Sequence, residues 1–267
     1  MQETKNKEYA KFINELEVFA KENYVPIIKK EAAEYIKNIL SLFVSKKIDE
    51  EIKKQNKNKK LGKELDQRLN KINLNLNILE LGTAIGYSGV IFTKHILDTL
   101  KKESELRNLK IDLNLKYISV EKDENRFKLA KENLDKLEKD CKMNFKKYIK
   151  IYNEDAEEFL KKIKVKKEKN NNENNKNIVI SGIDIAFIDA NKSAYLNYYM
   201  EVSKLMNKKG IMLFDNILFN GWVFGNYTEK KHRTIVKNLR KFIKYLDENE
   251  IAYKINEKAD GVLEINL

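Results

Sequence analysis

The feature that most constrains the fold is an alternation of short apolar runs and longer amphipathic stretches that starts at residue 76. Residues 76–81 read LNILEL, an apolar run that ends at a glycine-containing turn, and residues 87–100 then show helical spacing. A second run, KYISVE over 116–121, is followed by a helical pattern over 123–137. This order predicts a doubly wound, mostly parallel α/β sheet with helices on both faces. Ligands of such sheets bind beyond the carboxyl ends of the strands.

The rest of the chain extends this pattern. We expect further strands over 148–152, 183–189, 210–215, 252–256 and 261–267, and helices over 156–163, 193–206 and 228–249. The last two strands are expected to form an antiparallel hairpin at one sheet edge. Residues 164–177 (KVKKEKNNNENNKN) have no apolar periodicity and predict a polar surface loop.

The chain before this pattern is helical in character. Residues 3–20 and 33–43 carry apolar side chains at helical spacing, and the only proline, Pro26, predicts a turn between them. Residues 46–70 are mostly charged, and QNKNKK at 55–60 indicates either an exposed linker or a frayed helix. We therefore expect a helical extension with its linker over 1–70 and an α/β domain over 71–267.

The charge of the chain favours a polyanionic partner. Its formal net charge is +12, with 53 Lys and Arg against 41 Asp and Glu, and such a balance is typical of proteins that bind nucleic acid. A compositional bias towards lysine and asparagine would give the same charge without any partner. The single cysteine, Cys141, cannot build a disulfide framework, which indicates a reducing cytoplasm. We found no apolar signal core and no run of membrane-spanning length, so we expect no membrane association.

The turn after the first strand has the glycines of a ligand-binding loop. Gly82 and Gly86 allow the backbone to turn sharply beside a ligand, and the helix that follows offers free N–H groups. The spacing GxxxGxxG differs from the GxGxxG of dinucleotide-binding loops, which disfavours a nicotinamide dehydrogenase. Glu121, at the end of the second strand, can accept hydrogen bonds from a ribose diol, and Asp155 can accept one from an adenine amino group.

With these elements in order, the sequence resembles the class I S-adenosylmethionine-dependent methyltransferases, which have a Rossmann-like fold. More narrowly it resembles the metal-dependent O-methyltransferases typified by catechol and caffeoyl-CoA O-methyltransferases, and within them the bacterial enzymes that methylate 5-hydroxyuridine in tRNA. The motifs are ILELGTAIGYSG, FIDANKSAY, DNILFNGWV and a closing ADG, where Ala259 replaces the family's first glycine. The resemblance covers residues 25–267 and implies a homodimer built on the N-terminal helices.

The resemblance and the strand ends together suggest which residues contact S-adenosylmethionine. The expected contacts come from the glycine loop and from three later strand ends: Glu80, Gly82, Thr83, Gly86, Ser88, Glu121, Asp155, Ala156 and Asp189.

Three oxygen-bearing side chains follow the fourth and fifth strands. Asp189, Asp215 and Asn216 should meet in one crevice, where their hard oxygen ligands favour Mg²⁺, or alternatively Mn²⁺ or Ca²⁺, over zinc. A hydroxyl bound to such a cation ionises more easily. Lys192 can reach the same hydroxyl and act as general base if its pKa is lowered beside the cation. Asp189 and Lys192 are therefore the expected catalytic residues.

The sequence leaves the methyl acceptor open. Both 5-hydroxyuridine and a catechol present two vicinal oxygens, so the metal motif suits either a tRNA anticodon loop or a small molecule, including an acyl-CoA-linked phenol. Positive charge and the family resemblance favour tRNA, with candidate contacts at Lys29, Lys30, Lys230, Lys231 and Arg233. A non-catalytic RNA-binding protein with this fold is a further alternative. Phe219, Trp222 and Phe224 either wall the acceptor pocket or belong to the core or a dimer contact. Tyr195, Tyr198 and Tyr199 mostly contribute to packing, and His95 and His232 are not expected to bind metal.

Overall fold

The computed structural model describes residues 2–60, 71–165, 178–226 and 229–267, and it shows the predicted doubly wound sheet. Seven strands follow the order β3-β2-β1-β6-β7-β9-β8, all parallel except β9, which pairs antiparallel with both of its neighbours. The strands are β1 (Lys71–Leu81), β2 (Lys110–Glu121), β3 (Ile149–Asn153), β6 (Ile183–Ile188), β7 (Met206–Asp215), β8 (Tyr253–Asn256) and β9 (Val262–Asn266). The expected hairpin at the sheet edge is thus confirmed.

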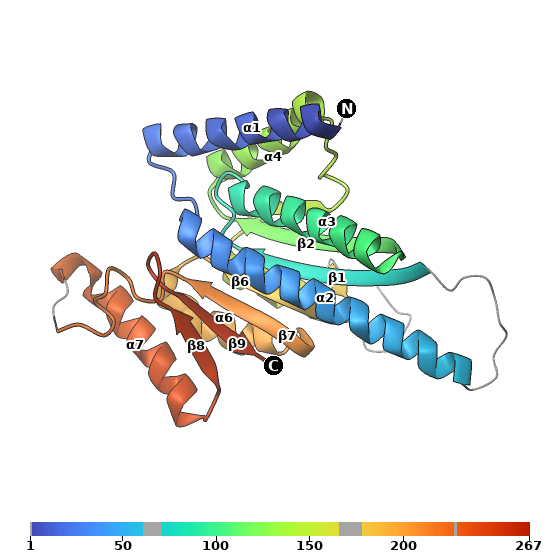
Figure 1. Ribbon diagram of the computed structural model, residues 1–267. Coiled ribbons are helices and arrows are strands. Elements are labelled where there is room, and N and C mark those ends of the chain that lie inside the picture. The colour runs from blue at the N-terminus through green and yellow to red at the C-terminus, as the bar shows by residue number, and fades with distance from the viewer. Residues whose placement is uncertain (1, 61–70, 166–177, 227–228) are drawn as a thin grey trace.

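Helices cover both faces of the sheet (Figure 1). They are α1 (Gln2–Glu22), α2 (Lys30–Lys60), α3 (Tyr87–Arg107), α4 (Glu124–Cys141), α5 (Ala156–Lys162), α6 (Tyr195–Ser203) and α7 (Arg233–Glu248), with short 3₁₀ turns at Lys192–Ala194 and Lys230–His232. The crossovers bring the carboxyl ends of the parallel strands to one edge of the sheet.

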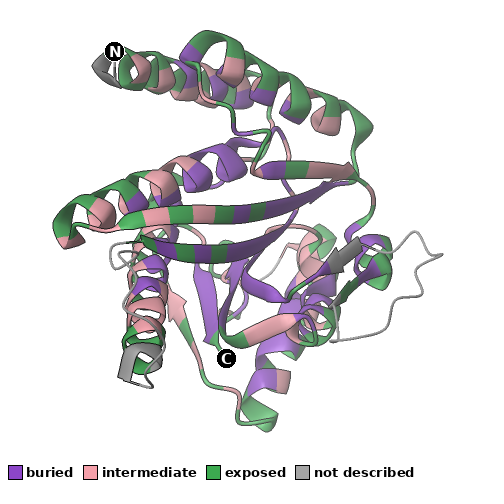
Figure 2. Ribbon diagram, turned by 90° about the vertical axis from the view of Figure 1, so that its right-hand side faces the viewer, coloured by how far each residue is buried: buried purple, intermediate pink, exposed green. Residues whose placement is uncertain are grey.

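The core consists of two clusters, one on each face of the sheet. On one face, Phe12 of α1 and Ile36 of α2 share a cluster with strand residues such as Leu74 and Tyr117. On the other, Phe159 of α5 and Phe242 of α7 pack against Val120 and Phe214. Figure 2 shows this burial as purple ribbon on the strands and on the inward sides of the helices. Because α1 and α2 share their core with the sheet, the helical extension packs as part of one body.

The structure corrects several predicted boundaries. The stretch at 55–60, predicted as a linker or a frayed helix, is the end of α2, which runs to Lys60; the predicted domain boundary at 70 lies outside the described residues. Residues 164 and 165, expected in a loop, belong to β4 (Ile163–Val165), which pairs in parallel with β5 (Ile178–Ile180). Burial of Ile163 and Ile180 accounts for this pairing. The remainder of the predicted loop, 166–177, lies outside the described residues.

The helix predicted over 228–249 begins later, at Arg233, after the 3₁₀ turn Lys230–His232. The helix predicted over 193–206 likewise shortens to α6, and Met206 belongs to β7. Within the described residues, no helix is both long enough and apolar enough to cross a bilayer.

Candidate active site

The strand register brings the predicted site residues to one edge. Leu81 pairs with both Val120 and Ile188, and Ile188 pairs with Phe214. The residues that come next in the chain are therefore neighbours, as the sequence predicted: Gly82, Glu121, Asp189 and Asp215. Several of them line a pocket of about 320 Å³: Gly82, Glu121, Asp155, Ala156, Asp189 and Lys192, together with Pro26, Lys122, Arg126 and Tyr198.

Position 82 requires glycine, because the end of β1 comes very close to the end of β6 there. The φ of Gly82 is +91°, and a Cβ built there would lie 2.4 Å from the backbone oxygen of Asp189. No side chain fits at such a distance, and the left-handed φ adds strain for any other residue. Gly86 also has a positive φ of +81° and precedes the first residue of α3. Glycine at 82 thus keeps the loop against the end of β6.

Glu80 lies beneath this loop and is fully buried. Its carboxylate accepts hydrogen bonds from the hydroxyls of Thr83, Ser88 and Ser119. Burial raises the pKa of the Glu80 carboxyl above its usual value, while the three hydroxyl donors oppose this shift. Of the predicted cofactor residues, Thr83 and Ser88 therefore each donate a hydrogen bond to Glu80, and these bonds hold the loop in shape.

Glu121 and Asp155 lie on the pocket wall. The two carboxylate oxygens of Glu121 accept hydrogen bonds from the backbone N–H groups of Ala84 (2.8 Å) and Asp123 (2.9 Å). Asp155 caps α5 by accepting a hydrogen bond from the N–H of Glu157. These bonds fix both carboxylates at the carboxyl ends of their strands, facing the same pocket.

Two carboxylates lie at the ends of the adjacent strands β6 and β7. Asp215 is 1% exposed, and its Oδ1 is one of the buried polar atoms without a hydrogen-bond partner in the described part of the chain. Burial, and then the negative charge of Asp189, raise the pKa of Asp215 to about 7. The positive charge of Lys192 opposes this shift; its Nζ lies 2.5 Å from Asp189 Oδ1. When both carboxylates are ionised, they carry more negative charge than Lys192 neutralises.

A divalent cation fits this arrangement. No group of three or more His, Cys, Asp or Glu side chains suited to a metal occurs among the described residues. The predicted set instead combines two carboxylates with the amide of Asn216, which follows directly at φ +55°. An unpaired buried carboxylate oxygen whose pKa a second carboxylate raises can bind a hard cation, because the cation supplies the missing positive charge. The residues present are thus compatible with Mg²⁺.

Tyr195 joins the ends of these two strands. Its buried hydroxyl donates to the backbone carbonyl of Asp215 at 2.6 Å and lies 3.2 Å from that of Ile188. Tyr195 also packs against Phe214 and Phe242. The sequence predicted that Tyr195 mostly contributes to packing; the hydrogen bond to the strand end adds a role in positioning Asp215.

The loop after β7 is held in a strained conformation. Asn216, Phe219 and Asn220 all have positive φ angles, which for Phe219 is unusual. The Arg240 guanidinium of α7 donates to the carbonyls of Trp222 (2.8 Å), Val223 (2.8 Å) and Gly225 (2.6 Å). At the other side of the loop, the carboxylate of Asp260 accepts the N–H of Asn220.

The aromatic residues of this loop divide into two groups. Phe219 and Trp222 pack against His232, with ring centroids 5.5 and 5.3 Å from the imidazole. Phe224 instead is 62% exposed. Of the other predicted minor residues, His95 lies 2.7 Å from the Ser41 hydroxyl, in a structural contact between α3 and α2.

Some residues that line the pocket or hold its neighbours in place could not be recognised as site residues from the sequence around them. Pro26 reaches the pocket from the connection between α1 and α2, and Ser119 reaches Glu80 from the neighbouring strand. Arg240 is one of many cations in its segment. Only the three-dimensional arrangement singles these residues out.

Comparison with known proteins identifies the family of the chain. A model of the O-methyltransferase family matches residues 30–262. A curated relative from Dictyostelium discoideum, named "Probable caffeoyl-CoA O-methyltransferase 3", is 48% identical over 48 residues, which are 18% of this chain and 19% of that protein. The match to that relative thus spans about a fifth of its length.

Solved structures share the fold. An O-methyltransferase from Bacillus cereus in complex with SAH is similar with a TM-score of 0.62 at 15% identity, covering 96% of this chain and 91% of the other. The O-methyltransferase TomG from Streptomyces achromogenes, involved in tomaymycin synthesis and solved in complex with SAM, gives 0.58 at 15% identity, with coverage of 96% and 89%. The fold is therefore that of the class I methyltransferases. The chain belongs to the O-methyltransferase family, since the family model covers most of its length.

Proposed function

We propose that this protein transfers a methyl group from S-adenosylmethionine to a hydroxyl oxygen. The observation that carries the proposal is the pocket at the carboxyl edge of the sheet, where the Gly82 loop, Glu121 and Asp155 adjoin the Asp189–Lys192 pair. Membership of the O-methyltransferase family and the cofactor names in the structural neighbours' titles, SAH and SAM, support the same chemistry.

The pocket residues suggest how the cofactor binds. Glu121 is placed to accept hydrogen bonds from the ribose hydroxyls, and Asp155 and Ala156 adjoin it on the side where the adenine would lie. The first N–H groups of α3, which have no partners within the helix, suit the cofactor's carboxylate. Glu80, Thr83, Gly86 and Ser88 preserve the shape of this loop.

Asp189, Asp215 and Asn216 are the residues that would hold a divalent cation. When bound there, such an ion lowers the pKa of an acceptor hydroxyl and orients it. The unpaired oxygen of Asp215 and the neighbouring carboxylate of Asp189 support this assignment.

The chain's own residues provide the proton transfer. We assign Lys192 as general base: as the neutral amine, its Nζ accepts the proton of the acceptor hydroxyl. The freed electron pair on oxygen forms a bond to the methyl carbon as the carbon–sulfur bond breaks, and that bonding pair stays on sulfur to give S-adenosylhomocysteine. Asp189 positions the Lys192 amine, since the two side chains are in contact. The pocket contributes mainly by aligning the reactants.

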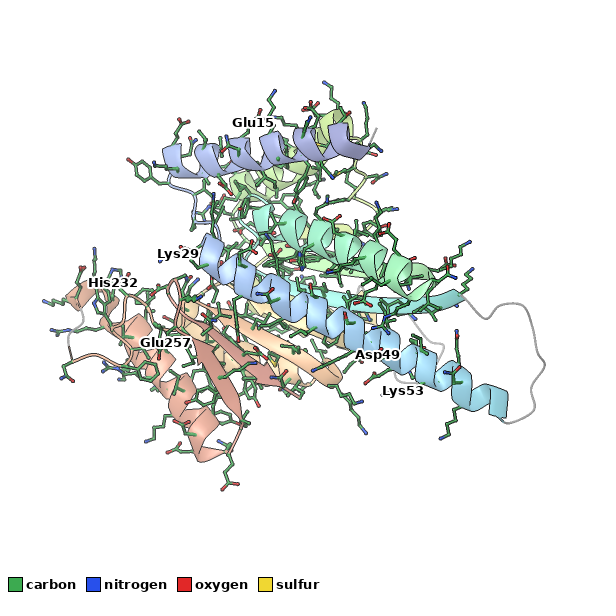
Figure 3. All side chains as sticks on the ribbon, viewed as in Figure 1. Glu15, Lys29, Asp49, Lys53, His232 and Glu257 are labelled. Atoms are coloured by element: carbon green, nitrogen blue, oxygen red, sulfur yellow. The ribbon has the colours of Figure 1, made fainter. Side chains whose placement is uncertain are left out.

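For the acceptor, we propose 5-hydroxyuridine at the wobble position of tRNA, which would become 5-methoxyuridine. The net charge of +12 and the exposed cations at Lys29 and Lys230 support an RNA substrate. Lys29 and His232 lie at the same end of the molecule in Figure 3, the end at which the strands terminate. A single-stranded anticodon loop can present an unstacked base to such a site.

A small-molecule acceptor is the second candidate, and the relatives' names favour it. They point to caffeoyl-CoA and to tomaymycin synthesis, which concern small acceptors. A catechol offers the same pair of vicinal oxygens, so the pocket chemistry would be unchanged.

A comparison of methyl transfer to each kind of acceptor distinguishes the two candidates. Labelled S-adenosylmethionine would be offered with tRNA lacking 5-methoxyuridine or with a panel of catechols and phenolic acyl-CoA esters. Label in tRNA at the wobble uridine is the expected result. Label in the small molecules alone would retain the methyl-transfer chemistry and reject the tRNA acceptor, while tRNA binding without any transfer would identify a non-catalytic RNA-binding protein.

A further inference from the structure

Helix α7 concentrates positive charge on one exposed face. Arg233, Lys237 and Lys241 are spaced four residues apart and are all exposed, and Lys244 and Arg240 extend the same face. Residues at this spacing lie on one side of a helix. The stripe from Arg233 to Lys244 spans about 16 Å, since a helix rises about 1.5 Å per residue.

Most of these cations have no carboxylate partner. By contrast, several lysines of α2–α5 pair with a carboxylate on the same helix: Lys54 with Glu51, Lys128 with Glu124 and Lys161 with Glu158. On α7, within the described residues, Arg233, Lys237 and Lys241 form no ion pair, and Lys244 pairs only with Glu248. The unpaired cations of α7 thus lie together on one exposed face, where a polyanion can reach them.

The stripe borders an open groove beside the loop that follows β7. The groove has a volume of about 610 Å³ and is lined by Arg233, Lys237, Arg240, Lys241 and Lys244, with Val236 and Asn226 as its only uncharged lining residues in the described part of the chain. Among the described residues, no carboxylate lines this groove. Arg240 fixes the adjoining loop through the carbonyls of Trp222, Val223 and Gly225.

The same groove adjoins aromatic surface. Phe224, between two residues held by Arg240, is 62% exposed. His232, just before α7, contacts Trp222 and Phe219 of the loop that follows the proposed metal-binding strand β7. The charged stripe is therefore continuous with the loop that begins at Asn216.

We propose that the outer face of α7 binds the phosphate backbone of a single-stranded RNA segment and directs it to the active site. Unpaired cations in a groove attract a polyanion by releasing its counterions, and an exposed aromatic ring beside them can stack a base. This combination is typical of single-strand binding. The proposal rests on the RNA acceptor proposed above and assigns its docking surface.

The test measures RNA binding separately from methyl transfer. Fluorescence anisotropy would follow a labelled single-stranded RNA of about 20 nucleotides across about 50 to 200 mM salt. The variant Lys237→Glu/Lys241→Glu removes two proposed phosphate contacts from an exposed surface. At about 0.7 per contact, the slope of log affinity against log salt should become shallower by about 1.4, and affinity at about 0.1 M salt should fall at least roughly 25-fold.

A matched control makes the same charge change on another basic helix. Lys46→Glu/Lys53→Glu alters two exposed lysines of α2 that line a different groove, which also contains Asp49 and Glu50. Figure 3 places Lys53 towards the end of α2 far from Lys29. This control should lower affinity only slightly, whereas Lys237→Arg/Lys241→Arg should bind as the wild type does. Thermal unfolding would verify that each variant is folded.

The outcomes separate this proposal from the proposed function. An equal loss of affinity in the α2 and α7 charge-reversal variants would overturn the α7 surface, as would binding of phosphatidylserine vesicles without binding of RNA. If the wild type methylates tRNA and the α7 variants bind it unchanged, the function stands and the docking surface is wrong. If the wild type binds RNA through α7 but methylates only catechols, the docking surface stands and the tRNA acceptor is wrong.

Discussion

Replacement of Asp215 by asparagine should remove a pH dependence of stability that the active site imposes on the protein. The structure raises the pKa of Asp215 from its ordinary value of 3.8 to about 7, mainly through burial and then through the charge of Asp189. Between these pH values the folded protein binds more protons than the unfolded chain, so stability falls as pH rises. This single group should cost about 4 kcal/mol at high pH, and more than half of that cost should develop between about pH 5 and pH 8.

The assay compares thermal unfolding of the wild type and Asp215→Asn at both pH values in EDTA. For a domain of this size, the part of the cost that develops between these pH values corresponds to a fall of about 5–10 °C in the melting temperature. The wild type should show this fall in addition to any change common to both proteins. The absolute stability of the variant is less informative, since a buried amide without a partner costs about 1–3 kcal/mol. The difference between the two pH dependences isolates Asp215.

Two further measurements test what raises the pKa of Asp215. Asp189→Asn removes the neighbouring charge and should reduce the pH dependence in part, because burial of Asp215 remains. Mg²⁺ at about 100 times its dissociation constant should stabilise the wild type by about 2.7 kcal/mol at pH 8 and leave Asp215→Asn unchanged. Equal pH dependences in the wild type and Asp215→Asn would refute the reasoning that burial and Asp189 raise this pKa.

Three other substitutions test the site and its loops. Gly82→Ala should destabilise the protein and weaken S-adenosylmethionine binding at least tenfold, since its Cβ would lie 2.4 Å from a backbone oxygen. Calorimetry would measure both effects. Gly89→Ala is the matched control, because its Cβ would meet only ordinary contacts at 3.6 Å or more. Ala259→Gly should raise the free energy of unfolding by about 0.5–1 kcal/mol, because Ala259 adopts φ +60°, and unchanged denaturant midpoints would contradict this. Lys192→Ala should lower kcat by about 10²–10⁴ and alter the pH–rate profile, and an unaltered profile would exclude Lys192 as the base.

The sequence predicted the fold and the grouping of the site residues because both depend on strand order. Apolar runs separated by helical patterns determine a parallel sheet, and residues after adjacent strands must then meet at its edge. Asp189 and Asp215 are neighbours for this reason. The position of Ala259 at φ +60° likewise explains why the family pattern quoted above has glycine there.

Features that depend on register and on distant packing could not be predicted from local patterns. The contact of Glu80 with the cofactor stays a prediction; local patterns did not indicate that its carboxylate accepts hydrogen bonds from Thr83, Ser88 and, across the sheet, Ser119. That last contact depends on the pairing of Glu80 with Ser119 in the β1–β2 register. Charge counts could not distinguish Arg240, which holds a loop through three carbonyls, from the unpaired cations beside it.

The most direct test of the proposed function is methyl transfer from labelled S-adenosylmethionine to tRNA that lacks 5-methoxyuridine, with Mg²⁺ or EDTA, alongside Asp215→Asn and a catechol panel. We predict label at the wobble 5-hydroxyuridine with Mg²⁺, and its loss both in EDTA and in the variant. Transfer that is equally fast in EDTA would contradict the role assigned to Asp189, Asp215 and Asn216. Absence of transfer to every acceptor, from a folded protein that binds S-adenosylmethionine, would contradict the enzymatic function itself.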